Sequence, residues 1–426
     1  MKELLFLTDR YPYNNSEAFI ENEIEITSKF FDKVYILPCG LMVDTKTCRN
    51  VPENVVIVDP PCQDNIYSDR PSIIKKVSWG LKNLLFWYIR CLFSKLFYRE
   101  IYYMIKSKQF NIRRVLRCFR TLAPSLRNAK YYRKKLKNEE LHNVYVYSYW
   151  IEPTVLLGKK IVSANKIQKE ICRTHRWDLY SEESSVGYLP FQKQIIEYID
   201  KLYVISDDGK DYLIKKYPDY TDKIVVSRLG TKDHGLNSDR TKDDLFLIVS
   251  CSNIIPVKRV ELIVDALSYL ESSDVSIYWL HFGAGQYLSD VKKYASEKLN
   301  NNVNYNFMGQ VSNEELMNFY QNNHVDLFVN TSSSEGIPVS IMEAISFGIP
   351  VAATDVGGTR EIVFNGENGI LLEKNFNPLE LTTYIKKMIE NKNQNIMRRK
   401  AREYWQKFYY CNLNYEMFYR DIIDIQ

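Results

Sequence analysis

The chain has 426 residues, of which 45% are hydrophobic and 26% are charged, a balance typical of a soluble globular protein with two domains of ordinary size. No stretch approaches the roughly 20 apolar residues of a spanning helix, and the start, MKELLFLTDRYPY, turns polar too soon for a signal peptide. The eight cysteines are scattered without metal-ligand spacing, which argues against disulfides and zinc. We therefore expect a cytoplasmic protein, with peripheral contact at the inner face of the cell membrane as an open alternative.

The net charge of +5 is unevenly distributed along the chain. Between Arg70 and Lys137 stand 19 Lys and Arg residues and one acid, Glu100, a net charge of +18, so the rest of the chain carries −13. Residues 72–137 interleave Trp, Tyr and Phe with these cations, which predicts two or three amphipathic helices. Such helices can lie on an anionic membrane or contact an anionic acceptor. The alternative is a helical insertion that packs on its own domain and solvates its charges. Nucleic-acid binding is disfavoured because no nucleic-acid motif accompanies the charge.

The first half of the chain alternates apolar runs typical of buried parallel strands with helix-like segments. Asp207 and Asp208 open one of these helices, which favours a helix N-terminus over a metal pair. The predicted strands are Leu4–Leu7, Val34–Pro38, Val55–Val58, Val144–Tyr147, Lys169–Thr174, Lys201–Ile205 and Ile224–Leu229. The predicted helices are Ala18–Phe30, Glu152–Ser163, Tyr188–Tyr198 and Ser206–Tyr217.

The same alternation restarts after a polar, charged stretch, Thr231–Asp244, whose composition is typical of a linker. The predicted strands of this half are Leu245–Ser250, Val275–Phe282, Val303–Phe307, Asp326–Val329 and Val351–Thr354. The predicted helices are Val260–Leu270, Tyr287–Leu299, Ser312–Gln321, Pro338–Phe347, Arg360–Val363, Pro378–Glu390, Ile396–Tyr410 and Tyr415–Ile425.

This pattern predicts an α/β protein of two Rossmann-like, doubly wound domains that face each other across a cleft. We expect a first domain over 1–230, with a basic, aromatic helical insertion at 70–137, and a linker over 231–244. A second domain over 245–410 and a C-terminal helix over 411–426, which packs back on the first domain, complete the predicted architecture.

Small residues end the strands of the second half, where open α/β sheets bind ligands. In the stretch NTSSSEGIPVSIMEAISFGIPVAATDVGGTREIV, the helix start offers free amides at Val339 and Ser340, which suit a phosphate. Lys258 and Arg259 supply positive charge, Glu343 can accept from a ribose diol, and Glu335 can reach a sugar. Together these groups predict a nucleotide-diphosphate-sugar site. A dinucleotide is disfavoured because G-x-G-x-x-G is absent, and GAGQYL lacks the third glycine.

The string SSSEGIPVSIMEAISFGIPVAATDVGGTREIV resembles the signature of retaining nucleotide-sugar glycosyltransferases of family 4, the group 1 glycosyltransferases, which have the GT-B fold. The resemblance extends to CSNIIPVKRVELIVDAL, FGAGQYLSDVKKYA, FMGQVSNEELMNFY and, in the first domain, RTHRWDLY. It covers most of the chain except the basic insertion. The segment YPYNNSEAFIENEI looks like the N-terminal part of bacterial enzymes that make cell-surface polysaccharides.

The resemblance implies a retaining hexosyltransferase that moves a sugar from a UDP or GDP donor to a glycan or lipid-linked saccharide acceptor, without a metal or a cofactor. The implied catalytic residues are Glu335 near the transferred sugar, Lys258 on the diphosphate and His175 near the reacting centre. Glu343 is the implied ribose ligand. The remaining expected donor contacts are Asn253, Arg259, Gly283, Gly285, Met308, Val311, Gly336, Ile337, Pro338, Val339 and Ser340. The acceptor-side candidates are Asp9, Arg10, Tyr13, Arg173 and Arg176.

The sequence departs from this family at two places. Asn253 stands where relatives usually have an arginine, and we expect Arg259 or one of Arg173 and Arg176 to supply the missing charge. The glycine pair common in the first loop is also absent, with Asn14-Asn15 in that region. Two alternatives stay open, a GT-B sugar-nucleotide epimerase and a catalytically silent nucleotide-sugar-binding subunit.

Overall fold

The computed structural model describes residues 1–13, 17, 19–40, 43–61, 84–236, 245–271, 275–299, 303–391 and 394–424. Asn14-Asn15, the start of the first predicted helix, residues 70–83 of the basic segment and residues 237–244 of the predicted linker lie outside these ranges. The chain forms two compact units. Unit 1 comprises Met1–Ile205, Gly209–Ser227 and Tyr415–Gln426, and unit 2 comprises Ser206–Asp208 and Arg228–Asn414.

Unit 1 is built on a sheet of seven parallel strands in the order β3-β2-β1-β4-β5-β6-β7. The central strands are buried on both faces, which explains their continuous apolar runs. The strand order reverses between β1 and β4, the place where such sheets open a crevice for ligands. The strands are β1 (Glu3–Thr8), β2 (Lys33–Pro38), β3 (Val55–Ile57), β4 (Val144–Ser148), β5 (Ile167–Thr174), β6 (Lys201–Val204) and β7 (Ile224–Val226).

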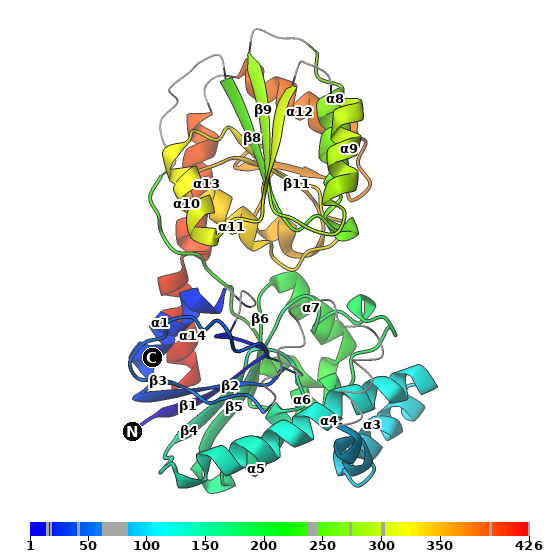
Figure 1. Ribbon diagram of the computed structural model, residues 1–426, viewed down its shortest axis with the longest axis vertical. Coiled ribbons are helices and arrows are strands. Elements are labelled where there is room, and N and C mark those ends of the chain that lie inside the picture. Colours follow the sequence, from blue (N-terminus) through cyan, green and yellow to red (C-terminus); the bar gives the residue numbers. More distant parts are fainter. Residues whose placement is uncertain are drawn as a thin grey trace. The chain divides into compact units, whose positions relative to one another are not determined.

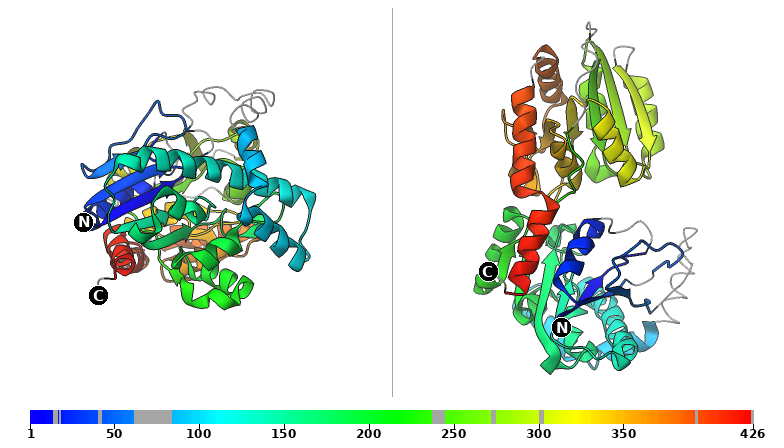
Figure 2. Two further views of the ribbon diagram at one scale, coloured as in Figure 1. Left: turned by 90° about the horizontal axis from the view of Figure 1, so that it is seen from below. Right: turned by 90° about the vertical axis from the view of Figure 1, so that its left-hand side faces the viewer.

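The described helices of unit 1 cover this sheet, and the last helix of the chain also belongs to it from Tyr415 onward. Figure 2 shows that helix, in red, beside the sheet of unit 1. The helices are α1 (Ile20–Phe30), α3 (Lys95–Lys106), α4 (Ile112–Lys135), α5 (Gly158–Ile161), α6 (Gln192–Tyr198), α7 (Asp207–Lys216) and α14 (Cys411–Ile422). Residues 84–91 are also helical. Short 3-10 turns, η2 to η6, lie at Leu136–Asn138, Val155–Leu157, Ala164–Lys166, Ser181–Glu183 and Pro218–Lys223.

Two helices predicted in unit 1 are shorter than expected. The predicted helix Glu152–Ser163 is a 3-10 turn, in which Val155 and Leu157 are both buried, followed by one α-helical turn. The helix predicted from Tyr188 begins only at Gln192, since Pro190 intervenes and Phe191 has a φ of 67°.

Unit 2 repeats the plan with six parallel strands in the order β10-β9-β8-β11-β12-β13. Figure 1 shows α8, α9 and α12 on one face of the sheet and α10, α11 and α13 on the other. The strands are β8 (Leu245–Cys251), β9 (Ser276–Phe282), β10 (Val303–Gly309), β11 (Leu327–Asn330), β12 (Val351–Thr354) and β13 (Gly369–Leu372). The helices are α8 (Glu261–Ser268), α9 (Leu288–Lys298), α10 (Asn313–Asn322), α11 (Val339–Ser346), α12 (Pro378–Glu390) and α13 (Asn395–Phe408), with 3-10 turns η7 (Pro256–Lys258) and η8 (Gly357–Glu361).

The sequence predicted unit 2 closely, with two exceptions. Strand β13 was not predicted, and the helix expected at Arg360–Val363 is the 3-10 turn η8. The capped helix α10 is confirmed, because Ser312 and Glu315 form the reciprocal hydrogen bonds of a capping box. Each unit has its own buried apolar core.

Among the described residues, no helix combines the length and the apolar character that crossing a bilayer requires.

Candidate functional site

The loops that end two strands of unit 2 pack against each other through glycines. A Cβ on Gly283, which has a φ of +136°, would lie 2.0 Å from the carbonyl oxygen of Ser252. A Cβ on Gly285 would lie 2.3 Å from the carbonyl oxygen of Ile254. Side chains are therefore excluded at both positions. These two predicted donor-binding glycines have a packing role, since they let the loops after β8 and β9 meet.

A second pair of glycines fixes the loop after β11. A Cβ on Gly357 would lie 2.0 Å from the carbonyl oxygen of Glu335, and the amide of Gly358 donates to the carbonyl of Gly336 over 2.7 Å. Gly357 has a φ of +53°, a conformation that glycine adopts without strain. The backbone at Glu335 is thus held in place by the segment that follows β12.

Glu335 forms an ion pair with Lys258. Its Oε1 lies 2.6 Å from Lys258 Nζ, and Asn330 Nδ2 donates to the same oxygen over 3.4 Å. The side chain of Glu335 is 8% exposed and that of Lys258 is 22% exposed, so the pair lies where charges interact more strongly than at an open surface. The structure therefore brings two of the three predicted catalytic residues together, from the loops after β11 and β8.

The N-terminus of α11 begins four residues beyond Glu335. Its N-cap, Pro338, makes no side-chain cap, and among the described residues the amides of Val339 and Ser340 have no hydrogen-bond acceptor. Both residues are half-buried, whereas Gly336–Pro338 are buried. Two amide donors at the positive end of a helix dipole form a suitable cradle for an anion.

Arg259 braces the loops of unit 2. It has a φ of 48°, and its Nε and Nη2 donate to the carbonyls of Thr331 and Ser332 over 2.8 and 3.1 Å. Its Nη1 donates to the carbonyl of Lys374 over 2.6 Å. The prediction that Arg259 replaces the arginine missing at Asn253 stays a prediction, because these three bonds to backbone carbonyls use three of the five N–H donors of the guanidinium. Asn253 itself is exposed.

Glu343 lies on α11 and is half-buried. Asn313, the first residue of α10, donates its Nδ2 to Glu343 Oε1 over 2.7 Å. Burial raises the pKa of Glu343 to about 7, and the bond from Asn313 acts in the opposite direction. The carboxyl group is thus poised to change its ionisation near neutral pH.

The predicted contacts to the base lie at the end of β10 and in the loop that follows it. Met308 is exposed and Val311 is half-buried. A cavity of about 440 Å³ lies beside the loop after β8, between the starts of α8 and α9, with Ile254, Glu261 and Tyr287 in its walls. It is not lined by Glu335, Glu343 or Lys258, so it is separate from the ion pair.

In unit 1, His175 follows β5 and lies in an aromatic cage. The ring centroids of Phe19, Tyr149 and Trp150 are 6.0, 4.6 and 4.4 Å from that of His175. His175 is 7% exposed, and neither ring nitrogen has a hydrogen-bond partner among the described residues. Burial, with Arg173 nearby, holds the pKa of His175 well below its usual range. The imidazole is therefore neutral at pH 7.

Glu17, which was not among the predicted site residues, organises the loop after β1. Its carboxylate accepts hydrogen bonds from the amides of Asp9, Arg10 and Tyr11 over 3.1, 2.6 and 2.7 Å, and from Trp150 Nε1 over 2.6 Å. Four donors on one buried carboxylate fix both the loop and an indole of the histidine cage. A single glutamate in this polar stretch carries no sequence signal for such a role.

Arg173 was predicted on the acceptor side or as a phosphate ligand, and the structure corrects this prediction. The residue is fully buried, and its Nη1 lies 2.7 Å from Glu23 Oε2, which is also fully buried. Its guanidinium carbon lies 4.1 Å from the ring centroid of Phe418 on α14. Arg173 therefore holds unit 1 together and cannot reach a ligand.

The other acceptor-side candidates lie in the loops after β1 and β5. Arg10 Nε is 3.2 Å from Asp9 Oδ2, and burial together with the charge of Glu17 raises the pKa of Asp9 to about 6. Tyr13 is buried, and Arg176 is half-buried and bonds to a nearby glutamate over 2.8 Å. Their contact with an acceptor stays a prediction.

Comparisons with known proteins show which family and which fold the chain resembles. The sequence model of the family "Glycosyl transferases group 1" matches residues 236–408. The O-antigen biosynthesis glycosyltransferase WbnH of Escherichia coli is 38% identical over 117 residues, which cover 27% of this chain and 30% of that protein. Across its first curated relatives, the chain spans between 30% and 62% of their length.

Solved structures resemble the whole chain. The lipopolysaccharide outer core galactosyltransferase WaaB, in its apo form, has a TM-score of 0.64 at 16% identity, with both chains fully covered. HepE of Anabaena, in complex with UDP-glucose, has a TM-score of 0.62 at 14% identity, again with both chains fully covered. At these identities the likeness establishes the fold. Residues 236–408 therefore match the group 1 glycosyltransferase model, and the two Rossmann-like units of the chain have the GT-B fold.

Proposed function

We propose that this chain is a retaining glycosyltransferase that moves a hexose-type sugar from a nucleotide-diphosphate sugar to a glycan or lipid-linked saccharide acceptor in the synthesis of a cell-surface polysaccharide. The observation that carries the proposal is the Lys258–Glu335 ion pair beside the uncapped start of α11. The ion pair and the helix start supply a cation, a carboxylate and an amide cradle, all within residues 236–408, which match the group 1 glycosyltransferase model.

The leaving group of this reaction is a nucleoside diphosphate, so negative charge grows on the phosphates while positive charge grows on the sugar. Lys258 and the amides of Val339 and Ser340 would hold the diphosphate, and Glu335 would orient the sugar. This positive charge from the chain's own groups supports transfer that does not depend on a metal. Lys258 would then exchange its partner, from Glu335 to the diphosphate, when the donor binds.

Retention would follow from attack on the face from which the diphosphate leaves. A phosphate oxygen of the departing group would accept the proton of the acceptor hydroxyl, so no protein nucleophile is needed. In unit 1, His175 is a neutral ring, and its contact with the sugar or the acceptor is a prediction that the resemblance alone implies. A lipid-linked acceptor would place the enzyme at the cytoplasmic face of the cell membrane.

A thermal-shift screen tests the proposal directly. We expect one of UDP-glucose, UDP-galactose, UDP-N-acetylglucosamine and GDP-mannose to raise the melting temperature of the protein, because a donor binds only the folded state. The same donor should then be hydrolysed slowly to free sugar and nucleotide. A donor that binds without turnover would point to a silent binding subunit, and an epimerised sugar would point to an epimerase. No shift with any donor would contradict the proposed function.

The affinity for the donor should rise with pH. Glu343 must be ionised to accept hydrogen bonds from both ribose hydroxyls, and its pKa is about 7. We therefore expect the Kd of the nucleotide sugar to fall about tenfold between pH 6 and pH 8. The phosphodiester groups of such a donor do not titrate in this range. Calorimetry at a series of pH values measures the effect.

Two variants make this pH test specific. Glu343→Gln should bind weakly at every pH and lose the dependence, because an amide does not titrate. Glu314→Gln, at an exposed position in the first turn of α10, should keep it. A dependence that persists in Glu343→Gln would disprove the ribose role.

A further inference from the structure

Helices α3 and α4 form a hairpin in unit 1 that carries an unusual surface. The two helices are in contact, with the rings of Phe97 and Phe119 4.5 Å apart at their shared interface. Their connection, residues 107–111, lies at the far end of α3. We name the last turns of α3, this connection and the first turns of α4 the hairpin tip, residues 102–117.

The hairpin tip exposes large apolar side chains that remain uncovered by the described residues. Eleven of the 23 exposed large hydrophobic residues in the described ranges lie between Leu85 and Leu116. Soluble surfaces scatter such residues singly, and a concentration of them marks an interaction site. Those of the tip, with their exposed fractions, are Tyr102 (56%), Ile105 (59%), Phe110 (56%), Ile112 (67%) and Leu116 (50%).

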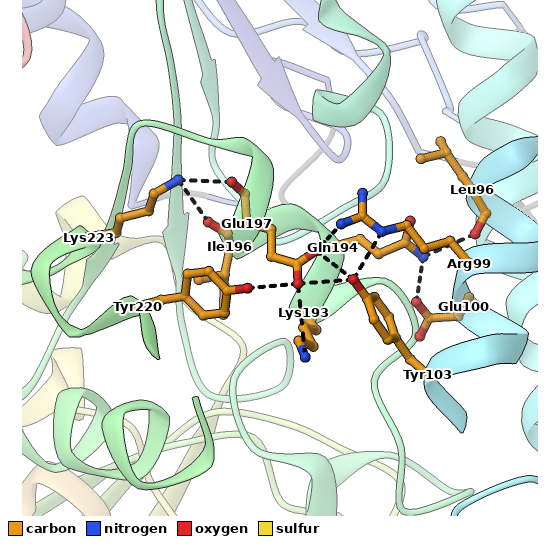
Figure 3. A network of polar contacts seen from close by, with 10 residues as sticks. All are labelled: Leu96, Arg99, Glu100, Tyr103, Lys193, Gln194, Ile196, Glu197, Tyr220 and Lys223. Atoms are coloured by element: carbon orange, nitrogen blue, oxygen red, sulfur yellow. Dashed lines mark hydrogen bonds and ion pairs between the residues drawn. The ribbon is translucent and has the colours of Figure 1, made fainter. Parts of the chain in front are cut away.

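The opposite face of α3 is tied to unit 1, so Tyr102 and Ile105 cannot turn inward. Figure 3 shows Glu197 of α6 at the centre of the contacts. Arg99 Nη2 and Tyr103 Oη donate to it over 2.5 and 2.8 Å. Glu100, buried on the same face, accepts from Gln194 over 2.7 Å. Helix α3 is therefore held by its inner face, and its outer face stays on the surface.

The charges around the tip have one sign. Lys106, Lys108, Arg113 and Arg117 are exposed. Between residues 84 and 138 the sequence has a single acid, Glu100, which is 2% exposed and hydrogen-bonded. The segment thus exposes apolar side chains and cations together, and none of its acids lies at the surface. Such a surface complements a layer that is anionic outside and apolar beneath.

We propose that the hairpin tip docks on the surface of an anionic lipid bilayer. The aromatic and aliphatic side chains would enter the boundary between headgroups and acyl chains, while the cations contact lipid phosphates. A nucleic acid fits less well, because only Tyr102 and Phe110 of the five exposed side chains could stack on bases, and the other three are aliphatic. Docking does not require glycosyl transfer, so this inference can be tested independently of the proposed function.

Co-sedimentation with vesicles tests the docking surface in the full-length protein. At low salt, we expect the protein to sediment with vesicles of phosphatidylcholine and phosphatidylglycerol and to stay in solution with phosphatidylcholine alone. The apolar variant Phe110→Ser/Ile112→Ser should bind the anionic vesicles at least about tenfold more weakly than the wild type. The charge variant Lys106→Gln/Lys108→Gln/Arg113→Gln should lose about fivefold for each cation removed.

A matched control uses exposed apolar residues of unit 2. Leu379→Ser/Ile396→Ser, at positions that are 48% and 64% exposed, should bind like the wild type. All variants should keep the wild-type melting temperature and its shift with a donor, which separates lost docking from misfolding. The proposal is overturned if the wild type does not bind anionic vesicles, or if the apolar variant binds as tightly as the wild type. Binding of an RNA oligonucleotide without binding of vesicles would overturn it as well.

Discussion

Replacing Lys258 or Glu335 by alanine is expected to lower turnover about a hundredfold or more, the usual effect of removing one oriented electrostatic group from a transition state. Lys258 would offset the charge that grows on the leaving diphosphate, and Glu335 would hold the sugar from which it departs. The two groups are 2.6 Å apart in the structure. Single-turnover kinetics with the donor identified by thermal shift measures the chemical step directly.

The double variant sharpens this test. Because the two side chains are bonded, their losses should not add, and Lys258→Ala/Glu335→Ala should be less impaired than the product of the single losses. Lys293→Ala, which removes a lysine that is 78% exposed on α9, is the matched control and should be fully active. Near-normal turnover in either single variant would remove both residues from the proposed catalytic site.

Replacing Arg173 by alanine is expected to destabilise unit 1 by about 3–5 kcal/mol, because it leaves the fully buried Glu23 without its cation. Burial already raises the pKa of Glu23, and Arg173 opposes that rise. Urea unfolding followed by tryptophan fluorescence should show an earlier transition for unit 1, whose Trp150 lies within it.

A charge-free replacement separates pairing from packing. Arg173→Met/Glu23→Leu removes both charges and keeps most of the buried volume, so it should recover much of the lost stability. Arg113→Ala, at an exposed arginine of the same unit, should change the free energy of unfolding by less than about 0.5 kcal/mol. Equal destabilisation by the single and double variants would contradict the ion-pair explanation.

The sequence predicted most strands because parallel sheets are buried on both faces, and buried strands such as β1 and β12 read as unbroken apolar runs. It missed β13, a strand of four residues, GILL, because so short an apolar run has no period of its own. The segment after Glu152 was predicted as a helix because its composition suits one, and tertiary packing of Val155 and Leu157 overrode that preference.

The candidate site, like the fold, could be predicted from the sequence only in part. Lys258, Glu335 and Glu343 were predicted because they stand in recognisable strings, and the structure places the first two in contact, while their roles stay predictions. The contacts of Arg173, Arg259 and Glu17 could not be predicted, because their partners lie far along the chain or are backbone groups. A sequence shows that an arginine is charged. Only the fold shows whether its guanidinium is already bonded to backbone carbonyls or paired with a buried carboxylate.

Helix α14 also has a consequence for the order in which the protein is completed during synthesis. Tyr415 and Tyr419 are fully buried in unit 1, and Asp421 bonds to both Lys201 and Tyr203 at its sheet. These residues leave the ribosome after all of unit 2. Unit 1 is therefore the first unit to enter synthesis and the last to be completed. Translation that stops before residue 415 would release a chain in which unit 2 is complete and the core of unit 1 lacks its last helix.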